Sequence, residues 1–297
     1  MALSNYSCRF GLKSIPNGTV NLFKIFERFH YGNLKRKFTS RSIDPDEVKR
    51  FSQNSSKWWQ TTDYLPLQRM NSLRVPFIVN SFKSEWFNRG SKYDSEENID
   101  SIRFPLKDLK LLDIGCGGGY LSEPLTRLGA DVIGIDPVIE NIKSAENHAK
   151  ISFKNSEPKL AYKCCSIEEF SSDPNNQNSF DAVIASEVLE HVEDKASFLQ
   201  NSIACIRPGG FYIITTINQT LLSYFGTILM AEYLLRLNPI GTHQYEKFTP
   251  PEVLDLILED YKCRVLKRQG MFFNPITFQW SWCDDQSICY ALLAIKN

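Results

Sequence analysis

Three side chains that could bind a metal ion or move a proton lie within five residues of one another: Glu187, Glu190 and His191. If a helix begins here, their spacing places two carboxylates and an imidazole on one helical face. Such a set can hold a divalent cation, because oxygen ligands favour Mg²⁺ or Mn²⁺ and the imidazole leaves Zn²⁺ open. The alternative interpretation is that His191 acts as a general base and that the two acids are structural.

A glycine-rich turn follows the apolar run from Leu109 to Ile114 and precedes a predicted helix. Glycines let the backbone pass close to a ligand, and the free N–H groups of a helix N-terminus can bind it. A second apolar run ends in Asp136, 21 residues after Gly115. An acid at this spacing can accept hydrogen bonds from the hydroxyls of a ribose. The turn therefore indicates a nucleoside cofactor in preference to an ordinary loop.

The pattern of glycines distinguishes between two classes of cofactor. The dinucleotide fingerprint G-x-G-x-x-G requires a third glycine at the position of Tyr120. The run 113–119 contains Gly115, Gly117, Gly118 and Gly119 and instead resembles the first motif of class I S-adenosylmethionine (SAM) methyltransferases. This resemblance implies that the turn passes the methionine part of SAM and that Asp136 holds its ribose.

The elements that must position these residues alternate between strand and helix. The sequence predicts strands over 109–114, 131–136, 160–165, 180–185, 210–217, 264–268 and 288–294. It predicts helices over 120–128, 138–151 and 250–258, and one that runs from 187, or a little later, to 206. Near-continuous apolar strands joined by helices are typical of a parallel sheet covered on both faces. We therefore expect an α/β, Rossmann-like fold with a mostly parallel seven-stranded sheet.

The distribution of charge argues against a nucleic-acid substrate. Residues 1–42 carry eight basic residues and one acid, which leaves 26 basic and 33 acidic residues in 43–297, a net charge of −7. Nucleic-acid binding draws much of its affinity from the neutralisation of phosphates by basic side chains. A domain with net negative charge repels these phosphates. The eight cysteines include no C-x-x-C pair, so the sequence does not predict a zinc ribbon.

The first 42 residues form a basic segment with an amphipathic centre. Its apolar side chains fall on one helical face and its charged side chains on the other: Leu22, Phe23, Ile25, Phe26 and Phe29 against Lys24, Glu27 and Arg28. This pattern predicts a mitochondrial transit peptide over residues 1–42, without fixed structure in the mature fold. A basic tail with no targeting role is the alternative.

Residues 43–297 are predicted to form one methyltransferase domain with two additions. An N-terminal extension, 43–105, contains Trp58 and Trp59, of which one is expected to pack on the domain and the other to cap a cavity. At about 219–246 we expect a lid that covers the substrate and touches a membrane surface, with a plain core helix as the alternative. Its most apolar part, 221–237, is interrupted by charges and falls short of the roughly 18 apolar residues of a membrane span.

Six short motifs give the chain a more specific resemblance. They cover about residues 45–297 and read Lys57-Trp58-Trp59, Asn71-Ser72-Leu73-Arg74, 112–119, 187–192, Gly241-Thr242-His243 and Asn274-Pro275-Ile276-Thr277. On these motifs the chain resembles the ubiquinone-biosynthesis O-methyltransferase family in its mitochondrial form. The resemblance implies that four residues contact SAM, namely Arg74, Gly115, Asp136 and Ser186. It implies that a metal ion, Mg²⁺ first among the candidates, is bound by Glu187, Glu190 and His191. It also leaves His191 as the catalytic residue.

The resemblance carries further expectations about substrates and partners. It implies polyprenylated catechols as substrates, namely polyprenyl-dihydroxybenzoate and demethylubiquinol. It further implies peripheral contact with the matrix side of the mitochondrial inner membrane and a place in a multi-subunit ubiquinone-biosynthesis complex. One position departs from the family pattern, which has a histidine three residues before the Asn-x-x-Arg motif, where this chain has Gln68.

Two other functions remain open at the level of sequence. One is a class I C- or N-methyltransferase that acts on another small molecule and needs no metal. The other is a non-catalytic, lipid-binding scaffold subunit of a biosynthetic complex. The glycine-rich turn, Asp136 and the acid–histidine set argue against the scaffold, because a scaffold has no need of them.

Overall fold

In the computed structural model of the chain, the described residues are 48–49, 51–52, 55, 58–61, 64–88, 103–227 and 244–297. The predicted transit peptide, residues 228–243 of the predicted lid and the Gly241-Thr242-His243 motif lie outside these ranges.

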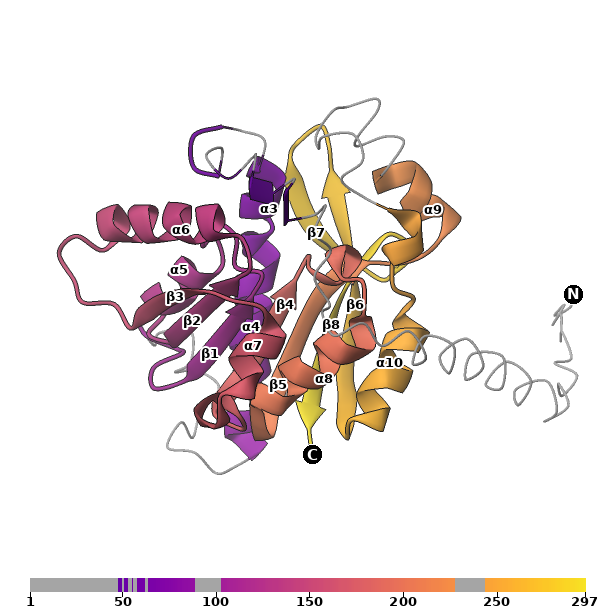
Figure 1. The fold of residues 1–297 in the computed structure, drawn as a ribbon. Coiled ribbons are helices and arrows are strands. Elements are labelled where there is room, and N and C mark those ends of the chain that lie inside the picture. The colour runs from indigo at the N-terminus through magenta and orange to yellow at the C-terminus, as the bar shows by residue number, and fades with distance from the viewer. Residues whose placement is uncertain are drawn as a thin grey trace, which may run out of the picture. The chain divides into compact units, whose positions relative to one another are not determined.

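The described residues form one eight-stranded sheet with the order β3-β2-β1-β4-β5-β8-β6-β7 (Figure 1). The strands are β1 (Lys110–Ile114), β2 (Asp131–Asp136), β3 (Leu160–Cys164), β4 (Phe180–Ser186), β5 (Ile206–Ile217), β6 (Cys263–Asn274), β7 (Gln279–Cys283) and β8 (Cys289–Lys296). Strands β1 to β5 pair in parallel. Strand β8 is antiparallel to β5 and β6, and β7 is antiparallel to β6. The predicted α/β, mostly parallel fold is confirmed.

Helices cover both faces of the sheet. They are α3 (Leu65–Arg69), α4 (Asn71–Asn88), α5 (Ser122–Arg127), α6 (Ile139–Ser152), α7 (Ile167–Ser172), α8 (Lys195–Cys205), α9 (Leu221–Ser223) and α10 (Pro251–Asp260). Consecutive side chains of a strand point to opposite faces. Accordingly, Phe211 of β5 packs on Phe82 of α4, with 5.2 Å between ring centroids, and Tyr212 lies beside Ser202 of α8. Figure 1 shows α7 and α8 in front of the sheet and α4 behind it.

The number of strands differs from the prediction by one. Strand β6 continues past residue 268 to Asn274, and the chain then returns as β7. The turn is stabilised by Asn274, whose side-chain oxygen accepts hydrogen bonds from the backbone N–H groups of Ile276 and Thr277 at 2.9 and 3.2 Å. This hairpin contacts the N-terminal extension, because the indole of Trp280 donates to the carbonyl of Pro66 at 2.8 Å.

The helix predicted from Glu187, or a little later, to 206 is wrong in its first part, because the helix begins only at Lys195. Glu187 adopts a left-handed backbone conformation with φ of 58°, which ends β4 and cannot continue into a right-handed helix. A 3₁₀ turn follows at Leu189–His191, and α8 begins at Lys195, after Asp194 accepts a capping hydrogen bond from the N–H of Ser197. Residues 207–210 belong to the irregular start of β5.

The strand order places a binding region at one edge of the sheet. Strand β1 lies between β2 and β4. The chain therefore builds β2 and β3 on one side of β1 and then crosses to the other side for β4 and β5. In open α/β sheets, ligands bind outside the carboxyl ends of the strands at such a point. None of the helices within the described ranges is long and apolar enough to cross a bilayer.

Candidate active site

A cavity of about 640 Å³ lies at this edge of the sheet. Three of its lining residues, Ile114, Asp136 and Ser186, are the last residues of β1, β2 and β4. All seven residues predicted from the sequence to form the site line this cavity: Arg74, Gly115, Asp136, Ser186, Glu187, Glu190 and His191. The fold therefore brings together residues that lie more than a hundred positions apart in the chain.

The glycine-rich turn forms one wall of the cavity, and two of its glycines are required by geometry. Gly115 has φ of 67°, and a Cβ there would lie 2.6 Å from the side chain of Val188. Gly117 has φ of 52°, and a Cβ there would lie 2.6 Å from the ring of Trp58. Both positions therefore exclude a side chain on two grounds, a left-handed backbone and a lack of space.

Asp136 is fixed beside this turn by three donors. Its Oδ2 accepts from the N–H of Gly117 at 3.0 Å, and its Oδ1 accepts from the N–H of Val138 at 2.8 Å and from the amide of Asn141 at 3.2 Å. Asp136 is 6% exposed, and burial raises its pKa to about 6, although the three hydrogen bonds act to lower the pKa. A carboxylate so placed can still accept hydrogen bonds from ligand hydroxyls, because two oxygens offer about four acceptor positions.

A chain of hydrogen bonds links Arg74 to Glu187 across the centre of the cavity. Arg74 Nη1 donates to Ser186 Oγ at 2.8 Å, Ser186 and Thr215 share a hydrogen bond of 2.7 Å, and Thr215 Oγ1 donates to Glu187 Oε1 at 2.8 Å. Burial lowers the pKa of Arg74 to about 10, while the charges of Glu187 and Asp113 act in the opposite direction. At neutral pH the guanidinium remains charged, so it faces the acids as a cation.

The two glutamates are held by consecutive residues of β5. Thr215 donates to Glu187, and Thr216 Oγ1 donates to Glu190 Oε2 at 2.8 Å. Because consecutive strand residues point to opposite faces, the carboxylates are bound from opposite faces of β5 and not along one face of a helix, as predicted. Burial and the charge of Glu187 raise the pKa of Glu190 to about 8. Without a bound cation, Glu190 is therefore mostly protonated at neutral pH, because a buried negative charge beside Glu187 is unfavourable.

His191 ends the 3₁₀ turn, and its ring meets the edge of Phe51 with 5.1 Å between centroids. Among the ranges that the structure describes, no three His, Cys, Asp or Glu side chains are grouped as metal ligands. The two carboxylates suit a divalent cation, which would stabilise their ionised forms. The described residues do not, however, bring three ligands together at one point. Joint ligation by Glu187, Glu190 and His191 stays a prediction.

The cavity continues beyond the acids into an apolar region. Its walls come from the end of β5, the start of β8 and the β6–β7 hairpin: Ile217, Ile288, Met271, Phe272, Phe273 and Trp280. Gln68, at the position where the family pattern has histidine, is exposed on α3 and lines a separate surface hollow instead of this cavity.

Several residues of the site were not identified from the sequence. Thr215 and Thr216 interrupt an otherwise apolar strand, and this pair of hydroxyls was an available signal. Trp58 lines the cavity and Trp59 packs on His148, which agrees with the expectation that the two tryptophans have different environments. Asn141 gave no signal, because a single asparagine in a helix is usually a surface residue.

Comparisons with known proteins identify the chain's relatives. A family model described as a methyltransferase domain matches residues 80–268. The mitochondrial ubiquinone biosynthesis O-methyltransferase of Rattus norvegicus is 42% identical over 263 residues, which are 87% of this chain and 71% of that protein. The human protein of the same name is 43% identical over 91% of this chain and 70% of its own length. The Rhodopseudomonas palustris (strain BisB18) enzyme is 37% identical over 86% of this chain and 94% of its own length.

A solved structure supports the fold independently of these sequences. Magnesium protoporphyrin IX methyltransferase from Synechocystis, crystallised with bound SAH (S-adenosylhomocysteine), superposes with a TM-score of 0.50 at 17% identity and covers 83% of this chain and 100% of that one. The fold is thus that of SAM-binding methyltransferases. Because sequence relatives at 37–43% identity extend over most of the chain, it belongs to the ubiquinone biosynthesis O-methyltransferase family.

Proposed function

We propose that this protein transfers a methyl group from SAM to a hydroxyl of a catechol-type, polyprenylated precursor of ubiquinone. The substrates are polyprenyl-dihydroxybenzoate and demethylubiquinol. The observation that carries the proposal is the order of surfaces in one cavity: the glycine-rich turn with Asp136, then the polar chain from Arg74 to Glu187 with His191, then an apolar region. This order suits a nucleoside cofactor, a reacting hydroxyl and an isoprenoid tail in turn.

The cofactor half of the site is assigned to Arg74, Gly115, Asp136 and Ser186. Asp136 accepts hydrogen bonds from the ribose hydroxyls, and Gly115 lets the backbone approach the ligand. Arg74 and Ser186 are already joined by a hydrogen bond of 2.8 Å, so they present one fixed polar surface to the ligand. Bound SAM supplies an electrophilic methyl group, and the protein contributes orientation.

The acceptor half requires a deprotonated oxygen. Where His191 is not a metal ligand, its free ring nitrogen takes the proton of the hydroxyl, which leaves an oxyanion as the nucleophile. As the O–CH₃ bond forms, the S–CH₃ bond breaks and the sulfonium becomes a neutral thioether. Arg74 keeps Ser186, Thr215 and Glu187 in fixed positions around this centre.

A divalent cation, Mg²⁺ first and Mn²⁺ or Zn²⁺ next, is part of the proposal, with Glu187, Glu190 and His191 as its ligands. Support comes from the raised pKa of Glu190. Burial and the nearby Glu187 make the ionised form of Glu190 unfavourable, and a bound cation would compensate the negative charge of both carboxylates. Mg²⁺ in particular is commonly held by one or two carboxylates together with water and substrate. When bound, the cation would lower the pKa of a catechol hydroxyl.

Removal of metal tests this part of the proposal. Treatment of the protein with a chelator is expected to lower the rate of catechol methylation at least tenfold, and added Mg²⁺, Mn²⁺ or Zn²⁺ should restore it. Binding of SAH should be unchanged, because Asp136 and the glycine-rich turn are not among the proposed metal ligands. A rate that is indifferent to the chelator would leave His191 as the base without a metal and make the acid pair structural.

The affinity for the cofactor is expected to depend on pH through Asp136. Its pKa in the free protein is raised to about 6, and hydrogen bonds from the ribose favour the ionised form, so binding favours loss of the proton. The affinity for SAH should therefore be constant above about pH 7 and fall by up to tenfold per pH unit below pH 6. Calorimetric titration of the wild type and of Asp136→Asn checks this, since an equal slope in both would contradict the assignment.

Location and partners complete the proposal. The rat and human relatives are named as mitochondrial proteins, and the basic amphipathic segment 1–42 supports import into the matrix. Peripheral contact with the inner membrane is supported by three exposed apolar side chains beside the cavity, Leu221, Leu222 and Phe225, at 73%, 57% and 53% exposure. A lid over about 219–246 and a place in a multi-subunit ubiquinone-biosynthesis complex are part of the same proposal.

A further inference from the structure

Trp58 lines the cavity beside the glycine-rich turn and is hydrogen-bonded to Asn141, which holds Asp136. Its indole packs so closely on Gly117 and Gly118 that a Cβ on either glycine would lie 2.6 Å from the ring. Its Nε1 donates to Asn141 Oδ1 at 2.8 Å, and Asn141 Nδ2 donates to Asp136 Oδ1 at 3.2 Å. The side chains of Trp58 and Asn141 are 5% and 2% exposed, so neither hydrogen bond is exchanged readily for water.

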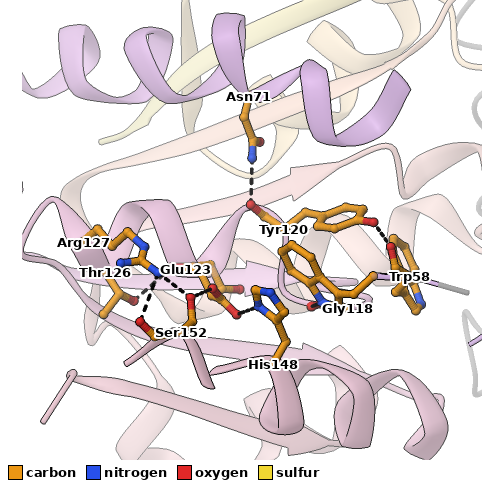
Figure 2. A network of polar contacts seen from close by, with 11 residues as sticks. Trp58, Asn71, Gly118, Tyr120, Glu123, Thr126, Arg127, His148 and Ser152 are labelled. Carbon is orange, nitrogen blue, oxygen red and sulfur yellow. Dashed lines mark hydrogen bonds and ion pairs between the residues drawn. The ribbon is translucent and has the colours of Figure 1, made fainter. Parts of the chain in front are cut away.

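Trp59 fixes the same segment of backbone to the next residue of the turn. Its Nε1 donates to the carbonyl of Gly118 at 2.8 Å, and its ring meets the edge of Tyr120. The hydroxyl of Tyr120 in turn donates to the carbonyl of Trp58 (Figure 2). Two consecutive indoles therefore both contact the turn, and the position of one constrains the other.

The far side of Trp59 stacks on a histidine that is hydrogen-bonded to a buried glutamate. Its ring stacks on His148 with 3.4 Å between centroids and an interplanar angle of 1°. His148 Nδ1 lies 2.6 Å from Glu123 Oε1, and Ser152 donates to the other oxygen of Glu123 at 2.7 Å. Figure 2 shows this group, in which Arg127 also contacts Ser152. Because Glu123 and Arg127 lie on α5 and His148 and Ser152 on α6, Trp59 is anchored to two regular helices.

We propose that Trp58 is a positioning residue for the cofactor site: it holds Asn141, Asn141 holds Asp136, and Trp59 on His148 anchors Trp58. The proposal rests on the proposed assignment of Asp136 to the ribose. It extends that assignment by making the affinity for the nucleoside depend on the N-terminal extension through an indole N–H. The relay lies apart from Glu187 and His191, so it should affect binding of the cofactor and not the chemical step.

The Trp58→Phe variant tests the relay, because it keeps an aromatic ring and removes the N–H. We expect the affinity for SAH, measured by calorimetric titration on the full chain, to fall about 5- to 50-fold, because the buried oxygen of Asn141 loses its donor. At saturating SAM, kcat and the KM for catechol should stay within about twofold of wild type. Trp282→Phe is the matched control, since this indole packs on Phe77 outside the cavity and should leave SAH affinity unchanged.

A double-mutant cycle separates a relay from general loosening. Once Asn141→Leu has removed the central amide, Trp58→Phe should weaken SAH binding no further. Additive losses would overturn the relay, and so would a Trp58→Phe variant that binds SAH as tightly as Trp282→Phe does. If Trp58→Phe does not fold, as judged by its unfolding midpoint, Trp59→Phe serves in its place, with weakened SAH binding expected and unchanged binding contradicting the anchor.

Failure of the relay and failure of the proposed function give different results. An Asp136→Ala variant that binds SAH as wild type does would overturn the ribose assignment, and the relay with it. Weakened binding in Asp136→Ala together with unchanged binding in Trp58→Phe would overturn the relay alone.

Discussion

Replacement of Arg74 by methionine is expected to lower the free energy of unfolding by about 3–5 kcal/mol. The guanidinium is 5% exposed and donates to Asn71 Oδ1, to Ser186 Oγ and to the carbonyl of Leu67, at 3.0, 2.8 and 2.9 Å. Methionine keeps most of the volume but leaves all three acceptors without their donor. It also removes the positive charge that faces Glu187 and Asp113. Urea denaturation followed by fluorescence measures the loss.

Arg69→Met provides the control for this experiment. Arg69 also donates to backbone carbonyls, those of Thr277 and Phe278, at 3.1 Å each, but its side chain is exposed. Water can replace these bonds, so the expected loss is below about 1 kcal/mol. Equal effects of the two substitutions would mean that the buried chain from Arg74 to Glu187 does not stabilise the centre of the site.

Replacement of His191 by glutamine is expected to lower kcat for catechol methylation by about 10²- to 10⁴-fold. Glutamine retains a polar side chain of similar reach but cannot accept a proton at neutral pH. The dissociation constant of SAH should stay near the wild-type value, because Asp136 and the glycine-rich turn are untouched. Steady-state kinetics and calorimetric titration together give this contrast.

Two observations would refine or contradict the role of His191. Partial rescue of the glutamine variant by added imidazole would support a general base, since the missing function is then supplied from solution. A kcat within threefold of wild type would contradict the assignment and would leave the hydroxyl proton to another acceptor.

The positions of the first strands and of the glycine-rich turn were predictable because both depend on local signals. The apolar runs at 109–114 and 131–136 end in glycines or in an acid, and the structure places β1 and β2 there within one residue. The hairpin of β6 and β7 was not predicted, and its contact with the N-terminal extension could not be, because the hydrogen bond from Trp280 to the carbonyl of Pro66 joins residues 214 positions apart in sequence. Long-range hydrogen bonds of this kind leave no local pattern.

The candidate site shows the same limit in a different way. Residue types and spacing identified Glu187, Glu190 and His191, but the helical geometry assumed for them was wrong, because Glu187 adopts a left-handed backbone that no local pattern announces. Arg74 was identified by family resemblance alone, and its partners became apparent once Ser186 and Thr215 were placed on adjacent strands. Side chains on separate elements therefore had to be located before the polar chain could be recognised.

The most direct test of the proposed activity is transfer of an isotopically labelled methyl group from SAM to a short-tailed catechol by the full chain. We expect one label per product, located on a hydroxyl oxygen of the ring, and no transfer to the analogue in which both hydroxyls are replaced by hydrogen. Tight binding of SAM without transfer to the catechol, or a label on a ring carbon, would contradict the O-methyltransferase assignment.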